Sequence, residues 1–270
     1  MRKNNRPIGV FDSGLGGLTV LRQLRRILPR ERFIYFGDTA RVPYGSKSPE
    51  TVRRYSAEIV RFLVKKNVKM VVVACNTSSA LALKDLKEKF PIPICGVVEP
   101  GAALALRKSI SGRIGIIGTE ATIKSQIYPI TLKALAGDRP IEVFGLATPL
   151  LVPLVEEGIT AGPIANLIIK NYLGHLWRME IDVLILGCTH YPLLKNTIRK
   201  ILDKNIVLVD SALAVAEKVK DILAKNNLAI EHGRKLSPEF YVTDSSEKFR
   251  QLGQRFLREK ISDVHLIKFL

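Results

Sequence analysis

The chain has 270 residues, 47% of them hydrophobic, which is enough to fill the core of one large or two ordinary domains and excludes a disordered protein. With 42 Lys and Arg against 25 Asp and Glu, the formal net charge is +17. These basic residues are spread over amphipathic stretches without interleaved aromatic side chains, a pattern typical of solvated helix faces. We therefore expect no specific nucleic-acid partner.

In the first half of the chain, short apolar stretches alternate with amphipathic ones. The apolar stretches predict buried strands at residues 8–11, 33–36, 71–74 and 94–98. The amphipathic stretches predict helices at residues 18–28, at 49–66, and from the polar cluster after Cys75 to about residue 90. Ser48 and Pro49 supply an N-cap and a first helical residue for the second of these helices.

The second half of the chain repeats the alternation. Strands are predicted at residues 114–117, 141–146, 183–186, 206–209 and 240–242. Helices are predicted from about residue 122, at 165–177, 191–202 and 211–225, and from 246. Apolar strands that alternate strictly with helices imply parallel sheets covered on both faces, so the predicted class is α/β. In such folds ligands bind beyond the carboxyl ends of the strands.

Two stretches of the chain resemble each other. Residues 71–77 (VVVACNT) and 184–190 (LILGCTH) both place a cysteine, followed closely by threonine, after small or apolar residues. A weaker likeness links residues 8–14 with residues 114–119. We infer two similar, doubly wound α/β domains that face each other, with Cys75 and Cys188 at the floor of a shared cleft.

The cysteines also indicate the compartment. Three of them, an odd number, argue against a disulfide framework and for a reducing environment, so we expect a cytoplasmic protein. The N-terminal residues lack the apolar run of a secretory signal, and no stretch approaches the roughly 18 apolar residues of a membrane span. Cys95 has an apolar sequence context and is predicted to lie in the core.

Cys75 taken alone has two interpretations. It is either a small buried side chain or a thiol at a helix N-terminus, where the helix dipole favours the thiolate. The second thiol, at Cys188, favours chemistry that needs one acid or base on each face of a substrate. Racemisation is such a reaction, because one group removes the α-proton and the other protonates the opposite face. Nearby polar groups must then stabilise the developing carbanion.

Metal binding is a competing use of these residues. Cys188 and His190 could be ligands, but the chain has no C-x-x-C or H-x-x-x-H pattern, and we expect neither a metal nor a cofactor. His190 alone could be structural, although its position beyond Cys188 favours the cleft. Residues 12–17 (DSGLGG) lack the spacing of a phosphate loop. Asp12 and Asp38, each at a strand end, are either structural or face the cleft.

Several motifs occur together in one known family. They are residues 10–17 (VFDSGLGG), 35–45 (YFGDTARVPYG), 74–77 (ACNT), 99–101 (EPG) and 187–192 (GCTHYP). Their combination, over about residues 7–211, resembles the bacterial glutamate racemases of the aspartate/glutamate racemase family. The resemblance implies a cofactor-independent enzyme that interconverts L-glutamate and D-glutamate and supplies D-glutamate for peptidoglycan.

The same resemblance implies an architecture. The active site would lie between two α/β domains, and the C-terminal segment would return to complete the first domain. Residues 1–99 and 210–270 would form the first domain, and residues 100–209 the second. The family also implies a homodimer.

Matched motif by motif, the resemblance assigns Cys75 to the α-proton of D-glutamate and Cys188 to that of L-glutamate. Asp12 and His190 would assist the two thiols. The positions matched to substrate binding are Asp12, Ser13, Tyr44, Gly45, Cys75, Asn76, Thr77, Cys188, Thr189 and His190.

Two further carboxylates are less well defined by the motifs. The segment 152–157 resembles one that bears a catalytic-site glutamate, which we place at Glu156, with Glu157 as the alternative. Asp38 belongs to the second motif, and the resemblance gives it no definite role.

Two other functions stay open on the sequence. The same fold and thiols could serve a racemase of aspartate, another small acid or a hydantoin. The net charge of +17 could instead serve a nucleic-acid-binding protein, whose affinity would depend steeply on salt.

Overall fold

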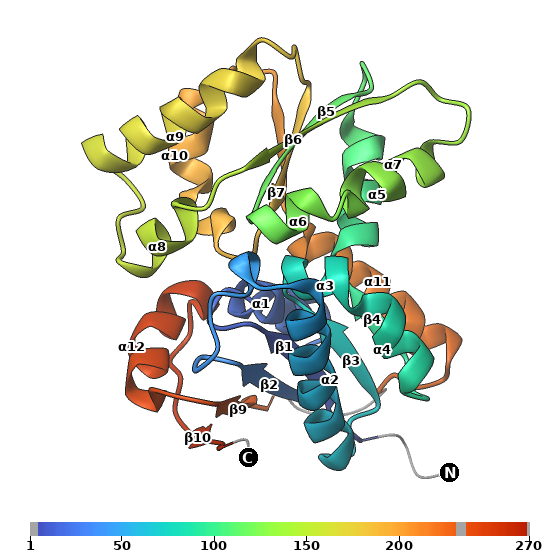
Figure 1. The fold of residues 1–270 in the computed structure, drawn as a ribbon. Helices are drawn as coiled ribbons and strands as arrows, with labels where there is room; N and C mark the ends of the chain where they lie inside the picture. The colour runs from blue at the N-terminus through green and yellow to red at the C-terminus, as the bar shows by residue number, and fades with distance from the viewer. Residues whose placement is uncertain (1–4, 231–235, 269–270) are drawn as a thin grey trace.

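The computed structural model describes residues 5–230 and 236–268 and arranges them around two parallel β-sheets, the lower and upper sheets of Figure 1. The first sheet contains β1 (Ile8–Asp12), β2 (Phe33–Gly37), β3 (Met70–Val73), β4 (Ile94–Gly96), β9 (Glu239–Val242) and β10 (Val264–Leu266). The second contains β5 (Arg113–Gly118), β6 (Glu142–Ala147), β7 (Val183–Gly187) and β8 (Val207–Val209).

The two sheets are wound in the same way. The first sheet has the order β10-β9-β2-β1-β3-β4 and the second has the order β6-β5-β7-β8, so the sequence-order pattern 2-1-3-4 occurs in both. Every strand pair is parallel. The predicted class, two similar doubly wound α/β units, is confirmed. The repeated cysteine stretches follow the equivalent strands β3 and β7.

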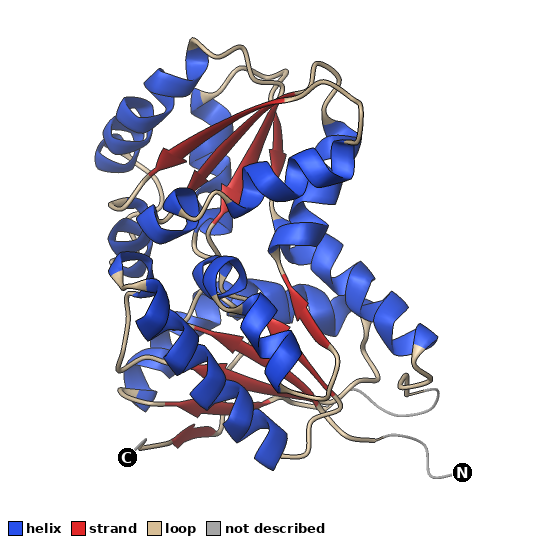
Figure 2. Ribbon diagram, turned by 45° about the vertical axis from the view of Figure 1, so that its right-hand side comes forward, coloured by secondary structure: helices blue, strands red, loops and turns tan. Residues whose placement is uncertain are grey.

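Helices cover the sheets on both faces (Figure 2). The helices that follow the strands of the first sheet are α1 (Leu18–Ile27), η1 (Tyr44–Ser46), α2 (Pro49–Lys65), α3 (Asn76–Leu81), α4 (Leu83–Lys89), α5 (Val98–Lys108) and α12 (Ser246–Leu257). Those that follow the second are α6 (Glu120–Lys124), α7 (Ile127–Ala136), α8 (Leu151–Glu156), α9 (Pro163–Trp177), η2 (Tyr191–Leu194), α10 (Lys195–Ile201) and α11 (Ser211–Lys225). Because helices lie on both sides, every residue of β1, β2, β3 and β7 is buried.

The C-terminal segment returns to the first sheet. Strand β9 pairs with β2, and β10 pairs with β9, so the two strands extend the edge of that sheet. Helix α11, which links the second sheet to this segment, packs against both α1 and α5. The chain therefore crosses between the sheets twice. The domain boundaries at residues 99, 100, 209 and 210 stay a prediction.

The local structure differs from the expectation at several points. The helix predicted from Cys75 to residue 90 is two helices, α3 and α4, separated at Ala82. The strand predicted at residues 94–98 ends at Gly96, and the unpredicted helix α5 starts at Val98. Pro100 lies in the first turn of that helix, where a missing N–H costs no hydrogen bond. Strand β10 was not predicted at all.

The core joins the two sheets. The largest hydrophobic cluster includes residues of the first sheet, such as Val10 and Val72, and of the second, such as Leu184 and Leu186. The two units are thus packed together rather than connected by an open linker. In the described ranges, we find no helix whose length and apolar character would let it cross a membrane.

Candidate active site

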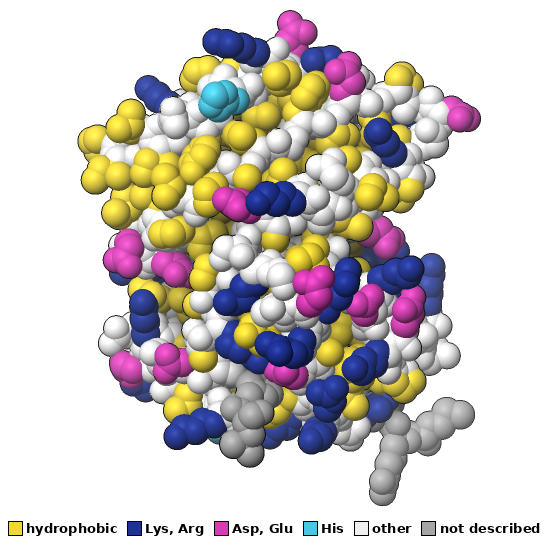
Figure 3. Space-filling view, in the orientation of Figure 1, with side chains coloured by type: hydrophobic (Ala, Val, Ile, Leu, Met, Phe, Trp, Pro, Cys, Tyr) yellow, Lys and Arg dark blue, Asp and Glu magenta, His cyan; other side chains and the backbone are white. Residues whose placement is uncertain are grey.

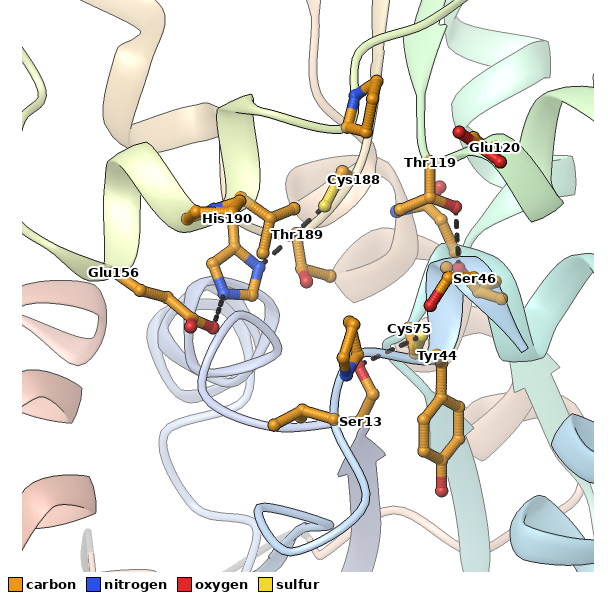
Figure 4. Close-up of a pocket in the computed structure, with 18 residues that line it drawn as sticks. Ser13, Tyr44, Ser46, Cys75, Thr119, Glu120, Glu156, Cys188, Thr189 and His190 are labelled. Carbon is orange, nitrogen blue, oxygen red and sulfur yellow. Dashed lines mark hydrogen bonds and ion pairs between the residues drawn. The ribbon is translucent and has the colours of Figure 1, made fainter.

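A cavity of about 270 Å³ lies where the carboxyl ends of the two sheets meet. Its walls come from segments that follow β1, β2, β3, β5, β6 and β7. Figure 4 shows Cys75 and Cys188 on opposite sides of it. The lining residues are Ser13, Val42, Pro43, Tyr44, Gly45, Ser46, Cys75, Asn76, Thr77, Thr119, Glu120, Pro149, Val152, Pro153, Glu156, Cys188, Thr189 and His190.

Cys75 is the N-cap residue of α3. Its Sγ accepts a hydrogen bond from the backbone N–H of Ser78 at 3.5 Å, and its S–H donates to Ser13 Oγ at 3.7 Å. Cys75 thus combines both interpretations offered by the sequence, because it is buried and also stands at the start of a helix. Burial, reinforced by the nearby carboxyl of Asp12, raises the pKa of Cys75 to about 11 despite these hydrogen bonds. The unliganded protein therefore holds this sulfur as a neutral thiol.

Cys188 follows β7 and faces a different group. Its Sγ lies 3.9 Å from Nδ1 of His190, and Nε2 of the same ring lies 3.0 Å from Oε1 of Glu156 on α8. Burial by itself would lower the pKa of His190, but the contacts with Cys188 and Glu156 outweigh it and raise this pKa to about 10. The hydrogen bond from His190 in turn lowers the pKa of Glu156. An imidazolium paired with a carboxylate thus stands beside the Cys188 sulfur.

Asp12 lies behind the cavity wall rather than on it. The side chain is fully buried, its Oδ2 accepts from the backbone N–H of Gly14 at 2.9 Å, and its Oδ1 accepts from the Thr189 hydroxyl at 3.2 Å. Burial raises its pKa, although the charge of His190 opposes that shift. Asp12 is not among the lining residues, and its hydrogen bond connects β1 to the residue after Cys188. Its contact with the substrate stays a prediction.

Two hydrogen bonds beside the cavity join the two units. The Tyr128 hydroxyl, on α7, donates to Oδ1 of Asn76 at 2.7 Å, and the hydroxyls of Thr77 and Thr119 lie 2.9 Å apart. Tyr128 was missed by the sequence reasoning, which had no signal for a phenol that only reaches the site through Asn76. Thr119 was missed as a lining residue although the likeness between residues 8–14 and 114–119 placed it at an equivalent strand end.

Asp38 supports the loop that carries Tyr44 and Gly45. Its carboxylate accepts hydrogen bonds from the Tyr44 hydroxyl, from Arg41 Nε at 2.7 Å and from Thr243 Oγ1 at 2.9 Å. Like Asp12, it is fully buried and absent from the lining. The backbone of Gly45 packs so closely against Thr119 that a Cβ there would lie 2.6 Å from the Thr119 Cβ. Glycine at this position therefore lets the loop approach the second unit.

Most of the other predicted residues reach the cavity. Ser13, Asn76, Thr77 and Thr189 line it, and so does Glu156, whereas Glu157 does not. Cys95 is buried elsewhere, in the core, as predicted. The lining residues that sequence reasoning did not name are Val42, Pro43, Ser46, Thr119, Glu120, Pro149, Val152 and Pro153. Among the described residues, His, Cys, Asp and Glu side chains nowhere gather in a group of three or more that could hold a metal ion.

The chain is similar to a known family over most of its length. The model of the Asp/Glu/hydantoin racemase family matches residues 8–219. A glutamate racemase from Geobacter metallireducens is 48% identical over 262 residues, which cover 97% of this chain and 96% of the relative.

Two solved structures match almost the whole fold. The glutamate racemase from Francisella tularensis, crystallised in complex with D-glutamate, superposes with a TM-score of 0.92 at 39% identity and 98% coverage of both chains. The Thermus thermophilus glutamate racemase, in complex with β-chloro-D-alanine, has a TM-score of 0.89 at 44% identity, with 99% of this chain and 98% of that chain covered.

The raised pKa of His190 predicts a pH-dependent stability. This pKa is about 10 in the folded protein and about 6.5 in an unfolded chain. The contribution of His190 to the free energy of unfolding is therefore complete below about pH 6.5 and is lost as the pH rises toward 10. Replacing Glu156 with Gln removes the anionic partner of His190 and should lower the pH midpoint of the His190 titration by about one unit or more. An imidazole ¹⁵N NMR titration measures this midpoint in the wild-type protein and in the variant. Glu157→Gln, outside the cavity, is the matched control and should leave the His190 midpoint in place; equal midpoints in all three proteins would contradict the assignment.

Proposed function

The chain belongs to the Asp/Glu/hydantoin racemase family, and we propose that it is an amino-acid racemase that interconverts L-glutamate and D-glutamate without a cofactor. The observation that carries this proposal is the pair of thiols, Cys75 and Cys188, on opposite sides of one cavity. Inversion at the α-carbon needs a base on one face and an acid on the other, and the two thiols supply both.

Each direction uses the same two groups in exchanged roles. From D-glutamate, the Cys75 thiolate takes the α-proton as the carbon–hydrogen bond breaks, and the Cys188 thiol gives its proton to the opposite face of the carbanion. From L-glutamate, the Cys188 thiolate takes the proton and the Cys75 thiol delivers one. One thiol and one thiolate remain after each turnover, with their positions exchanged.

The surroundings of the thiols reduce the mismatch in acidity between sulfur and the α-carbon. An amino-acid α-proton is far less acidic than a thiol, and burial makes Cys75 a stronger base by raising its pKa to about 11. On the other side, the protonated His190 lies beside Cys188 and stabilises negative charge on that sulfur. Asp12 acts through Thr189, which it holds by a hydrogen bond, rather than on the substrate.

Neutral N–H and O–H groups in the cavity can donate to the two carboxylates of glutamate, and hydroxyl oxygens can accept from its amino group. The candidates are the residues that we matched to binding and that line the cavity: Ser13, Tyr44, Gly45, Asn76, Thr77 and Thr189. Hydrogen bonds from N–H and O–H groups to a carboxylate are stronger than those between neutral partners. Since Tyr128 occupies Oδ1 of Asn76, the amide N–H₂ of that residue is left for an anionic acceptor.

The cellular role that we propose follows from this activity. D-glutamate made in the cytoplasm would supply peptidoglycan synthesis.

A homodimer is supported by apolar side chains of α9, where Ile164, Leu167 and Trp177 are 58%, 71% and 48% exposed. Hydrophobic side chains gather over that part of the surface in Figure 3. Sedimentation should therefore give a dimer, and a monomer at micromolar concentration would contradict this proposal.

The substrate is tested with purified protein and no added cofactor. Circular dichroism should show L-glutamate losing its signal until the mixture is racemic, with L-aspartate losing its signal at least about tenfold more slowly, because a shorter chain cannot place its distal carboxylate on the same donors. Faster loss with L-aspartate would move the proposal to an aspartate racemase of the same fold.

The thiols are tested one at a time. Cys75→Ala and Cys188→Ala should each reduce racemisation by about a thousandfold or more, because each removes an obligatory proton carrier. In deuterium oxide, Cys188→Ala should still exchange the α-hydrogen of D-glutamate, and Cys75→Ala that of L-glutamate, as followed by proton NMR. Cys95→Ala, a change at the buried third thiol, is the control and should leave turnover intact. Normal racemisation by either single variant would falsify the two-thiol mechanism.

A further inference from the structure

The side chain of Ser78, on α3, has no hydrogen-bond partner among the described residues. It is fully buried, yet its Oγ forms no hydrogen bond of ordinary length and angle with another side chain or with a backbone carbonyl of its own helix. A hydroxyl buried in this way costs free energy, because it has lost its hydrogen bonds to water without replacement. Such groups are uncommon in folded proteins, and a role in the chemistry of a nearby site is one explanation for them.

The hydroxyls on either side of Ser78 are satisfied. Ser79 Oγ donates to the backbone carbonyl of Val73 at 2.9 Å and accepts from the N–H of Val97 at 3.2 Å. Thr77 Oγ1 lies 2.9 Å from Thr119 Oγ1. The three consecutive hydroxyl residues therefore differ in their hydrogen bonding. Ser79 connects α3 to β3, Thr77 contacts the second unit through Thr119, and Ser78 between them has no such partner.

Ser78 lies next to the sulfur of Cys75. The backbone N–H of Ser78 already donates to the Cys75 sulfur at 3.5 Å, which places both residues in the first turn of α3. The neutral thiol uses its own proton to donate to Ser13 Oγ. Once the sulfur is ionised, that proton is gone, and a thiolate needs several donors when it is shielded from water.

Among the residues that the structure describes, no cation contacts Cys75 in the way that His190 contacts Cys188. The titratable side chains that interact with Cys75 are Asp12 on β1, Tyr35 on β2 and Tyr44 on η1. None of the three can carry a positive charge: Asp12 opposes the thiolate, and burial keeps the two phenols neutral by raising their pKa values. Only neutral donors are left to stabilise it.

We propose that the Ser78 hydroxyl is a further catalytic residue, which donates a hydrogen bond to the Cys75 thiolate when that sulfur acts as the base toward D-glutamate. The backbone N–H of Ser78 and the reoriented hydroxyl of Ser13 complete a cradle of three donors. No covalent bond changes; the hydroxyl only turns toward the sulfur. The Ser78 hydroxyl already lies near enough to the sulfur for hydrogen bonding to it to lower the pKa of Cys75, although by less than burial raises it. The proposal rests on the proposed racemase function, but its chemistry concerns Cys75 itself.

The test measures how readily Cys75 forms a thiolate. Iodoacetamide alkylation is followed by peptide mass spectrometry between about pH 7 and pH 9, where the rate is proportional to the thiolate fraction. Ser78→Ala should slow alkylation of Cys75 about three- to tenfold at each pH, because a hydrogen bond to an ionised group is lost. Alkylation of Cys188 in the same digest should keep its rate. This readout needs no turnover, so it can fail or succeed independently of the substrate assignment.

Activity and a neighbouring variant separate catalysis from structure. In Ser78→Ala, kcat/KM should fall several-fold and by the same factor for both enantiomers, since they have equal free energy in solution. Its melting temperature should stay the same or rise, because the change removes an unpartnered buried hydroxyl. Ser79→Ala is the matched control: it should lower the melting temperature and leave the alkylation rate of Cys75 unchanged.

Two results would overturn the proposal. The first is a Ser78→Ala protein with the wild-type alkylation rate at Cys75. The second is an equal loss of alkylation in Ser78→Ala and Ser79→Ala, which would mean that α3 had simply shifted.

Discussion

Burial of two sulfur atoms between two sheets is the constraint on which this structure depends. A thiolate shielded from water is costly unless donors or a cation face it. The chain meets this requirement differently on the two sides. Cys75 contacts neutral groups, the backbone N–H of Ser78 and the Ser13 hydroxyl, whereas the His190 imidazolium, paired with Glu156, faces Cys188. The fold is symmetric in its winding, but the two proton carriers stand in opposite electrostatic surroundings.

Hydrogen bonds around the same cavity connect the two units. Hydrogen bonds from Asp12 to Thr189, from Tyr128 to Asn76 and between the hydroxyls of Thr77 and Thr119 all cross from one sheet to the other. Each of these contacts ends next to a thiol or on a residue that follows one. The packing of the two units therefore also sets the positions of the acid and the base. A shift of either sheet would move a sulfur together with its hydrogen bonds.

Local periodicity and the residues at strand ends were sufficient to predict the class and the two thiols. Apolar runs before Cys75 and Cys188 specified buried parallel strands, and parallel strands present the residues that follow them at one edge of a sheet. Periodicity was not sufficient at β10 or α5. Strand β10 has only three residues at the sheet edge, and the apolar stretch that starts at Ile94 runs on into a helix at Val98.

The sequence by itself determined that two thiols end equivalent strands; only the tertiary structure decided what each side chain does there. Asp12 and Thr189 are 177 positions apart, and Tyr128 and Asn76 are 52 apart, so no local pattern shows that they meet. The pKa values of Cys75 and His190 likewise depend on burial and on partners from other elements. The unused hydroxyl of Ser78 is the clearest case. Its neighbours in sequence are also hydroxyl residues, and only the packing of α3 shows which of them has no partner.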